Sequence, residues 1–163
     1  LAGGGLYNNL DYSFTPPHPN GTFVEYKSPG GGSPALRRQL QILKRFLDGF
    51  DFLRMAPDPQ SVRRITAGVQ ARALTQRGKQ YAVYVHVPPP KKAKDDELRQ
   101  YSEKAVTAEL VLHLPAGLYR ADWWDTRTGQ VASAGKFSHS GGEKVFQTPS
   151  FTEDVALRLF AAP

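Results

Sequence analysis

The stretch GLYRADWWDTRTG, residues 117–129, decides the fold class. Tyr119, Ala121 and Trp123 recur at every second position, which is the period of a half-buried β-strand. The segment DTRTG that follows is typical of a hairpin turn, and Gly129 suits a left-handed backbone position there. The stretch therefore predicts a strand that turns back into an antiparallel partner.

Three more segments alternate in the same way: QYAVYVHV (80–87), AELVLHLP (108–115) and EDVALRLF (153–160). Weaker strands fit residues 62–67, 69–75, 131–138 and 143–147, with turns at Arg77–Gly78 and Gly141–Gly142. Short strands separated by turns predict an antiparallel β-sandwich, here over residues 57–163. The charged segment 88–104 between two strands is predicted to be a mobile loop with a helical turn.

The residues before this sandwich have a different pattern. SPALRRQLQILKRFLDGFDFLRM, residues 33–55, predicts an amphipathic helix that Ser33 caps and Pro34 begins. Its apolar residues recur at helical spacing, and the stripe is wide enough to need a packing partner: Leu36, Leu40, Leu43, Leu47 and Phe50. APDPQS (56–61) breaks the helix. We expect two domains, 1–56 and 57–163, and expect residues 1–55 to be poorly stable alone.

Composition excludes several classes of function. The chain has no cysteine, which rules out disulfides and thiolate chemistry, and no run of about 18–20 apolar residues that would cross a membrane. Its net charge of +6 comes from scattered basic residues without an RNA-binding aromatic motif, so we predict no nucleic-acid partner. The chain begins at Leu1 and has one methionine, Met55, which suggests a segment of a longer protein.

The segment GGGLYNNLDYSF, residues 3–14, has the composition of a saccharide site. Aromatic rings pack on the apolar face of a pyranose, and amide or carboxylate groups bind its hydroxyls. The substrate-binding candidates are Tyr7, Asn8, Asn9, Asp11 and Tyr12. The alternative is a surface loop whose Asn and Asp side chains bond to their own backbone. Composition alone leaves both open.

Trp124 is the second candidate, as a platform on which a sugar polymer could stack. The alternative places one of the two adjacent tryptophans in the core and the other on the surface, with Asp125 capping the turn. Glycoside hydrolysis usually needs two facing carboxylates, and Asp11 and Glu25 are the only acids among the first 47 residues. We therefore predict no catalytic residue in this chain, and neither metal nor cofactor.

Several motifs together resemble a known family. GGGLYNNLDYSFT, PNGTF and GGGSPALRRQLQILKRFLDGFDFLRMAPD resemble the end of the (β/α)8 barrel of bacterial apiosidase-like glycoside hydrolases. YAVYV, LHLPAGLYRADWWDTRTGQV and FTEDVALRLF resemble the small sandwich that follows those barrels, a module named for collagen binding.

The resemblance implies a role for each part of the chain. Residues 34–51 would be the last helix of the barrel, and residues 3–14 would form part of the rim of the substrate site. The catalytic carboxylates would lie on earlier strands that this chain lacks. The partners would be a poly- or oligosaccharide and the missing barrel, without membrane association, and the protein would be exported to the periplasm or the medium.

Two functional classes remain open for the sandwich. It is either an accessory domain packed on the barrel or a binding module for polysaccharide or for a fibrous protein such as collagen. An exposed row of Trp124, Tyr84 and Phe160 would favour binding. Aromatic side chains that pack inward or onto residues 34–55 would favour the accessory domain.

Overall fold

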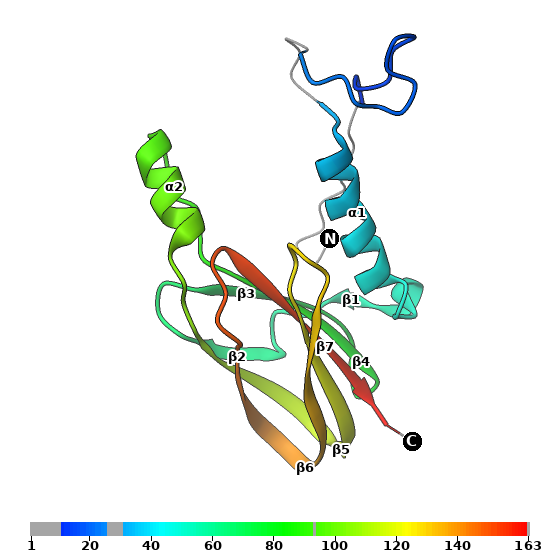
Figure 1. Ribbon diagram of the computed structural model, residues 1–163. Helices are drawn as coiled ribbons and strands as arrows, with labels where there is room; N and C mark the ends of the chain where they lie inside the picture. Colours follow the sequence, from blue (N-terminus) through cyan, green and yellow to red (C-terminus); the bar gives the residue numbers. More distant parts are fainter. Residues whose placement is uncertain (1–10, 26–30, 93, 163) are drawn as a thin grey trace.

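The computed structural model describes residues 11–25, 31–92 and 94–162, and this part of the chain is mainly β (Figure 1). Its elements in chain order are α1 (Pro34–Leu47), the 3-10 helix η1 (Phe52–Arg54), β1 (Ala56–Pro57), β2 (Val62–Ile65), β3 (Gln70–Gln76), β4 (Gln80–His86), α2 (Asp95–Glu103), β5 (Glu109–Trp124), β6 (Val131–Gln147) and β7 (Asp154–Ala161). None of the described helices is long and apolar enough to cross a membrane.

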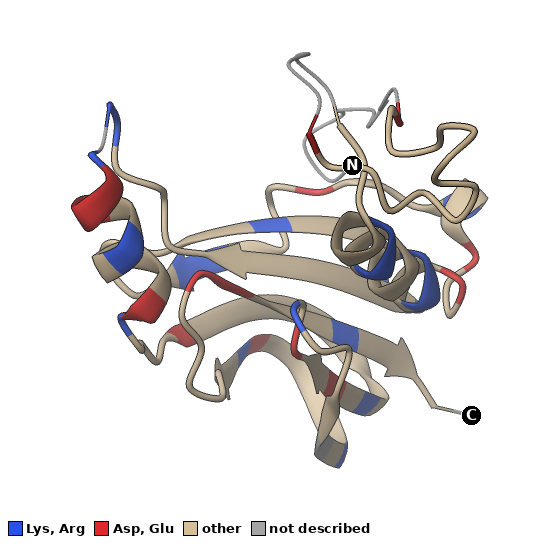
Figure 2. Cartoon of the chain, turned by 45° about the horizontal axis from the view of Figure 1, so that its top comes forward, with Lys and Arg blue, Asp and Glu red and all other residues tan. Residues whose placement is uncertain are grey.

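The strands form a single antiparallel sheet that folds over itself into two layers. Its hydrogen-bonded order is β1-β3-β4-β7-β5-β2, and β6 pairs with β5. The first half of β5 pairs with β2, whereas its second half pairs with β7. The larger layer therefore contains β1, β3, β4, β7 and the second half of β5, and the smaller layer contains β2 and the first half. Figure 2 shows the two layers, with α1 on the outer side of one of them. The predicted antiparallel, mainly β fold is confirmed.

The passage between the layers lies at a corner in the β5–β6 pair. Ala116 of β5 is paired with Ser140 of β6, and Gly141 and Gly142 follow with φ values of +96° and +101°. A side chain at Gly141 would meet the backbone nitrogen of Ala116 at 3.4 Å. Glycine is required here because this backbone region is unfavourable for other residues. The predicted turn at Gly141–Gly142 between two strands is wrong, since β6 continues through the corner as one strand.

The main hydrophobic core fills the space between the two layers. Of the apolar positions that alternate in the four segments, only Val87 is half-buried, and the others are buried there: Tyr81, Val83, Val85, Leu110, Leu112, Leu114, Tyr119, Ala121, Trp123, Val155, Leu157 and Leu159. The predicted hairpin after β5 is also confirmed, because the Asp125 carboxylate accepts hydrogen bonds from the backbone N–H of Arg127 and Thr128, both at 2.8 Å. Gly129 has a φ of +72°.

A side chain accepts a backbone hydrogen bond at the N-terminal end of each α-helix. The Ser33 hydroxyl accepts a hydrogen bond from the Leu36 N–H at 3.0 Å, as the sequence predicts. The helix ends at Leu47, earlier than the resemblance implies. In segment 88–104 the structure has the nine-residue helix α2, where the Glu97 carboxylate accepts a hydrogen bond from the Lys94 N–H at 2.9 Å. Three acids in its first turn suit the positive end of the helix dipole.

Asp58 ties the connection between β1 and β2 to the end of β3. Its carboxylate accepts hydrogen bonds from the hydroxyls of Ser61 (2.6 Å) and Thr75 (3.0 Å) and from the Arg77 guanidinium at 3.0 Å. Burial alone would raise the pKa of Asp58, but the bonds from Arg77, Ser61 and Thr75 outweigh it and lower the pKa to about 2.

This network predicts a specific dependence of stability on pH. Because the pKa of Asp58 in the folded state lies below the ordinary value of 3.8, its charge stabilises the fold above about pH 4. That contribution is lost as the pH falls from about 4 to about 2. We expect Asp58→Ala to lower the free energy of unfolding by about 1–2 kcal/mol at pH 7, and by much less at pH 2.

Urea unfolding at pH 7, 4 and 2 measures this difference. Asp48→Ala is the matched control, because its carboxylate is exposed at the end of α1 and pairs only with Lys44 among the described residues. A deficit of Asp58→Ala that stays constant across the three pH values would contradict the assignment.

Candidate functional site

The predicted saccharide-binding loop is only partly described. Tyr7, Asn8 and Asn9 lie outside the described residues. Of the other two candidates, Tyr12 is exposed, whereas the Asp11 carboxylate is engaged within the protein. Their role in binding a sugar stays a prediction.

Asp11 organises the loop around itself. Its carboxylate accepts hydrogen bonds from the backbone N–H of Ser13 at 2.9 Å and from the Ser13 hydroxyl at 2.5 Å. The Arg37 guanidinium of α1 completes the group at 2.9 Å. The Ser13 hydroxyl lowers the pKa of Asp11 most, and the Ser13 backbone N–H and Arg37 lower it further. This is the Asx-turn arrangement weighed as the alternative to a sugar ligand.

Arg37 fastens this loop to the first turns of α1. Its guanidinium donates hydrogen bonds to the carbonyls of Asn20 (3.2 Å) and Gly21 (2.7 Å) and lies 4.8 Å from the centre of the Phe14 ring. Gly21 has a φ of +67°, and a side chain there would collide with Arg37. The loop from Asp11 to Gly21 is thus held at the N-terminal end of the helix.

Trp124 lies buried beneath α1, and not on the surface where a stacking platform would need it. Its side chain is 5% exposed within a second hydrophobic cluster, which we call the helix–sheet cluster: Phe46, Phe50, Leu74, Ala82, Trp124 and Ala156. Phe46 meets the indole edge-on with ring centres 5.6 Å apart. Adjacent residues of a strand face opposite sides, so Trp123 enters the main core and Trp124 points outward, where α1 covers it.

Arg158, which no sequence motif marks, completes this cluster. The Arg158 guanidinium lies 4.7 Å from the centre of the Trp124 ring and 5.6 Å from that of Phe160. It also approaches the buried Asp122 carboxylate at 3.6 Å, and Arg120 approaches the same oxygen at 3.3 Å. The signal was present, because the alternation of strands β5 and β7 puts Asp122, Trp124 and Arg158 on one face.

A groove runs between α1 and the outer face of the larger layer, with a volume of about 460 Å³. Leu40, Leu43 and Leu47 line its helix side, and Leu74 and Tyr84 line its sheet side. The Tyr84 hydroxyl donates a hydrogen bond to the Asp154 carboxylate at 2.6 Å. Burial first, and then this carboxylate, raise the pKa of Tyr84.

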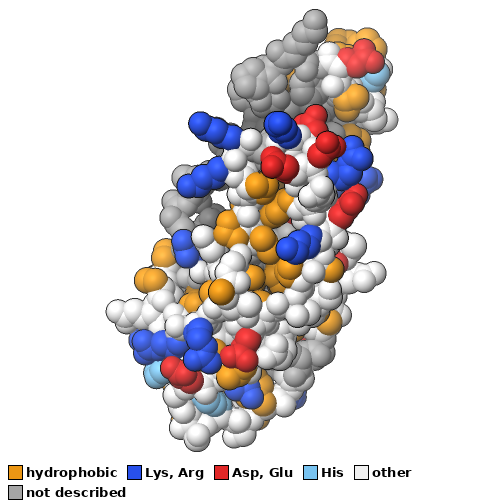
Figure 3. All heavy atoms as spheres, turned by 90° about the vertical axis from the view of Figure 1, so that its left-hand side faces the viewer, with side chains coloured by type: hydrophobic (Ala, Val, Ile, Leu, Met, Phe, Trp, Pro, Cys, Tyr) orange, Lys and Arg blue, Asp and Glu red, His pale blue; other side chains and the backbone are white. Residues whose placement is uncertain are grey.

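In the space-filling view of Figure 3, apolar side chains occupy the middle of the face shown, and charged ones gather toward its ends.

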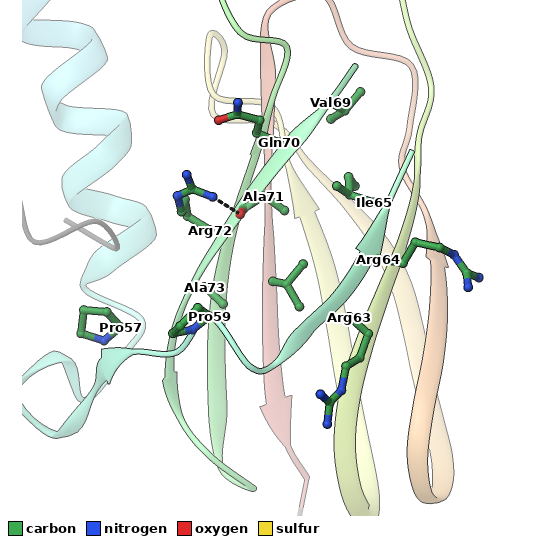
Figure 4. A pocket seen from close by; sticks show the side chains of 11 residues that line it. Pro57, Pro59, Arg63, Arg64, Ile65, Val69, Gln70, Ala71, Arg72 and Ala73 are labelled. Carbon is green, nitrogen blue, oxygen red and sulfur yellow. Dashed lines mark hydrogen bonds between the residues drawn. The ribbon is translucent and has the colours of Figure 1, made fainter. Parts of the chain in front are cut away.

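A second cleft lies between β2 and β3, with a volume of about 800 Å³. Figure 4 shows Ile65 of β2 and Ala71 of β3 lying toward the space between the two strands, whereas Arg64 points away from it. Among the described residues no group of three His, Asp or Glu side chains could hold a metal ion in either cleft or elsewhere.

Comparisons with known proteins identify the fold but not the family. No protein-family model and no curated protein matches the sequence. Among solved structures, one described as a glycoside hydrolase aligns with 86% of this chain at 16% identity and a TM-score of 0.55. A glycoside hydrolase family 5 protein from Bacteroides vulgatus aligns with 84% at 17% identity and a TM-score of 0.54.

These alignments span only a part of the larger proteins. They cover 31% and 29% of the two solved chains. The chain is therefore similar in fold to a segment of glycoside hydrolases, and membership of the apiosidase-like group stays a prediction.

Proposed function

We propose that this chain is the non-catalytic end of a carbohydrate-active glycoside hydrolase, with the sandwich as an accessory domain fixed to the last helix of a (β/α)8 barrel. In this proposal α1 is that helix, and residues 3–14 contribute to the rim of the substrate site. The similarity in fold to segments of two glycoside hydrolases supports it.

The observation that carries the proposal is the burial of Trp124 under α1. A binding module presents aromatic rings to its ligand, but here α1 covers Trp124 through Phe46. Phe160 is half-buried with its ring centre 5.0 Å from that of Phe50. Tyr84 alone of the three aromatic candidates is exposed. Trp124 and Phe160 of the sandwich thus contact the helix and the segment after it, as expected for an accessory domain.

The rest of α1 and the segment after it present apolar groups that need a further partner. Leu43 is 43% exposed and Leu53 is 96% exposed. In a (β/α)8 barrel the last helix packs on the strands and on its neighbouring helices. The exposed apolar side chains fit a helix that has a second contact surface of this kind.

The position of the N-terminal loop supports the second part of the proposal. In (β/α)8 barrels the loops that precede helix N-termini lie at the face that carries the active site. Arg37 and Asp11 hold the loop at the N-terminal end of α1, and Tyr12 is exposed there. Tyr12 would then face substrate, while Asp11 would fix the shape of the rim.

An antibody raised against this chain tests the proposal on the natural protein. A barrel adds about 250 residues, so we expect the antibody to detect a polypeptide well above 18.0 kDa, in the periplasm or the medium. Immunodepletion should remove hydrolase activity on a panel of oligosaccharides, and antibody preabsorbed with the chain should not. A natural protein of about 18 kDa without such activity would contradict the proposal.

A further inference from the structure

The sandwich is closed along one side and open along the other. At the closed side β5 and β6 pass continuously from one layer to the other. At the open side β2 and β3 follow each other in the chain and are joined by a turn in which the Val69 N–H donates to the Thr66 carbonyl at 3.1 Å. They nevertheless pair with different strands, β5 and β4, so the cleft between them is a gap in the wall of the sandwich.

On the side that borders this cleft, β2 pairs with no other strand of the described chain. The Ser61 carbonyl accepts a hydrogen bond from the His113 N–H of β5, and the Thr66 N–H donates one to the Glu109 carbonyl of β5. Because backbone groups alternate in direction along an antiparallel strand, those of Val62 and Ile65 face away from β5, into the cleft.

The facing edge of β3, by contrast, already has hydrogen-bond partners. The Ala73 carbonyl bonds to the Asp58 N–H on the side away from β4. Ala71, two residues earlier, faces that side too. Its carbonyl accepts a hydrogen bond from its neighbour Arg72 at 3.2 Å, as Figure 4 shows.

The wall of the cleft is apolar, and its deepest residues are small. Val62, Ile65 and Val69 are half-buried, and behind them Ala71 and Ala73 are 8% and 3% exposed. Alanine at these two inward positions of β3 leaves space that a larger side chain would fill. A strand lying along the edge could insert alternate side chains into it.

The charged residues among those that line the cleft are arginines. Arg63, Arg64 and Arg72 border it, although the Arg64 side chain points away from it (Figure 4), and none of the described acidic residues is among its lining residues. Arg64 pairs with Glu109 at 3.2 Å, whereas Arg63 is exposed and, among the described residues, forms no ion pair. Basic residues on an edge strand also discourage aggregation, but that role does not account for the recessed apolar wall behind them.

From these features we propose that the open side of the sandwich binds an extended peptide segment with alternating apolar side chains and acidic flanks, which pairs with the free edge of β2. The backbone of Val62 and Ile65 supplies hydrogen bonds, the recess at Ala71 and Ala73 accepts a side chain, and Arg63 selects the acidic flank. This is a protein-interaction site separate from the saccharide function proposed above and independent of it.

Nuclear magnetic resonance titration of the ¹⁵N-labelled 163-residue chain tests the site. The probe is a blocked seven-residue peptide of alternating valine and threonine with glutamate at each end, and the control peptide has lysine at each end. We expect saturable shifts of the amides of residues 62–65 and of Ala71, with binding of the lysine peptide at least fivefold weaker.

Two charge reversals provide the matched variants. Arg63→Glu should weaken binding of the glutamate peptide at least fivefold. Lys136→Glu makes the same change in charge at an exposed position of β6 and should leave binding unchanged. Both replaced side chains are exposed, so both variants should keep the wild-type thermal midpoint.

Three results would overturn the proposal. The first is the absence of shifts at millimolar glutamate peptide, and the second is equal binding of the two peptides. The third is a shift of the β2 amides with protein concentration alone, which would show that a second copy covers the edge.

Discussion

Trp124→Ala is expected to lower the free energy of unfolding by about 3–5 kcal/mol, which is the range for removal of a buried aromatic side chain. For a chain of 163 residues this corresponds to a fall in the thermal midpoint of roughly 10–15 °C. The loss is large because the indole contacts both Phe46 of α1 and Arg158 of β7. Its removal therefore weakens the attachment of the helix as well as the sheet surface.

Urea unfolding measures the global effect, and limited trypsin digestion measures the attachment of α1. Cleavage after Lys44 and Arg45 should accelerate more in Trp124→Ala than the change in global stability explains. Trp124→Phe should be milder, since the indole N–H bonds to no described protein group. Tyr84→Ala is the control in the same, larger layer. Its aromatic residue is 41% exposed, so its removal should cost less stability than that of Trp124. A loss below about 1 kcal/mol for Trp124→Ala would mean that α1 is not held by this cluster.

Arg158→Ala should produce the second largest loss, about 3 kcal/mol. The Asp122 side chain is 2% exposed, and removal of Arg158 leaves it with Arg120, whose side chain is 56% exposed. A buried charge that loses a partner is strongly destabilising, because its desolvation is no longer offset. Arg158→Lys should recover only part of the loss, since lysine keeps the charge but lacks the planar group that lies over Trp124 and Phe160.

A double-mutant cycle separates the charge from the packing. Asp122→Leu combined with Arg158→Met removes both charges while keeping apolar volume, and should cost much less than the sum of the single replacements. The measurement is urea unfolding in low salt and in 1 M salt, where the loss in Arg158→Ala should persist because the pair is buried. Additive single and double effects would show that Asp122 and Arg158 do not interact.

The sequence predicts the strands well where a strand faces the core on one side. QYAVYVHV, AELVLHLP and EDVALRLF alternate because each contributes one face to the main core, and each is a strand in the structure. The alternation does not indicate what covers the outward face of these strands. Trp124 and Phe46 meet only after the chain has folded, and no local periodicity records which segment covers an outward tryptophan.

The corner of the sandwich illustrates a second limit. Two consecutive glycines are typical of a turn, but Gly141 and Gly142 bend a continuous strand because the paired strand β5 bends beside them. For the candidate site, the sequence indicates only which residue types the loop contains, and not which contacts they form. The sequence predicts a polar aromatic loop at residues 3–14, but the hydrogen bonds that fix Asp11 come in part from Arg37, a residue of the following helix.

The shared strands β5 and β6 also have a mechanical consequence. Two separate sheets can slide over each other, whereas two layers threaded by the same pair of backbones cannot shear without stretching covalent bonds. Because both strands bend at Ala116, Gly141 and Gly142, we expect any relative movement of the two layers to be a change of the angle at this corner. Such a change of angle would alter the width of the cleft between β2 and β3. It would leave the β4–β7 surface under α1 intact, because the β5–β6 corner would act as the hinge.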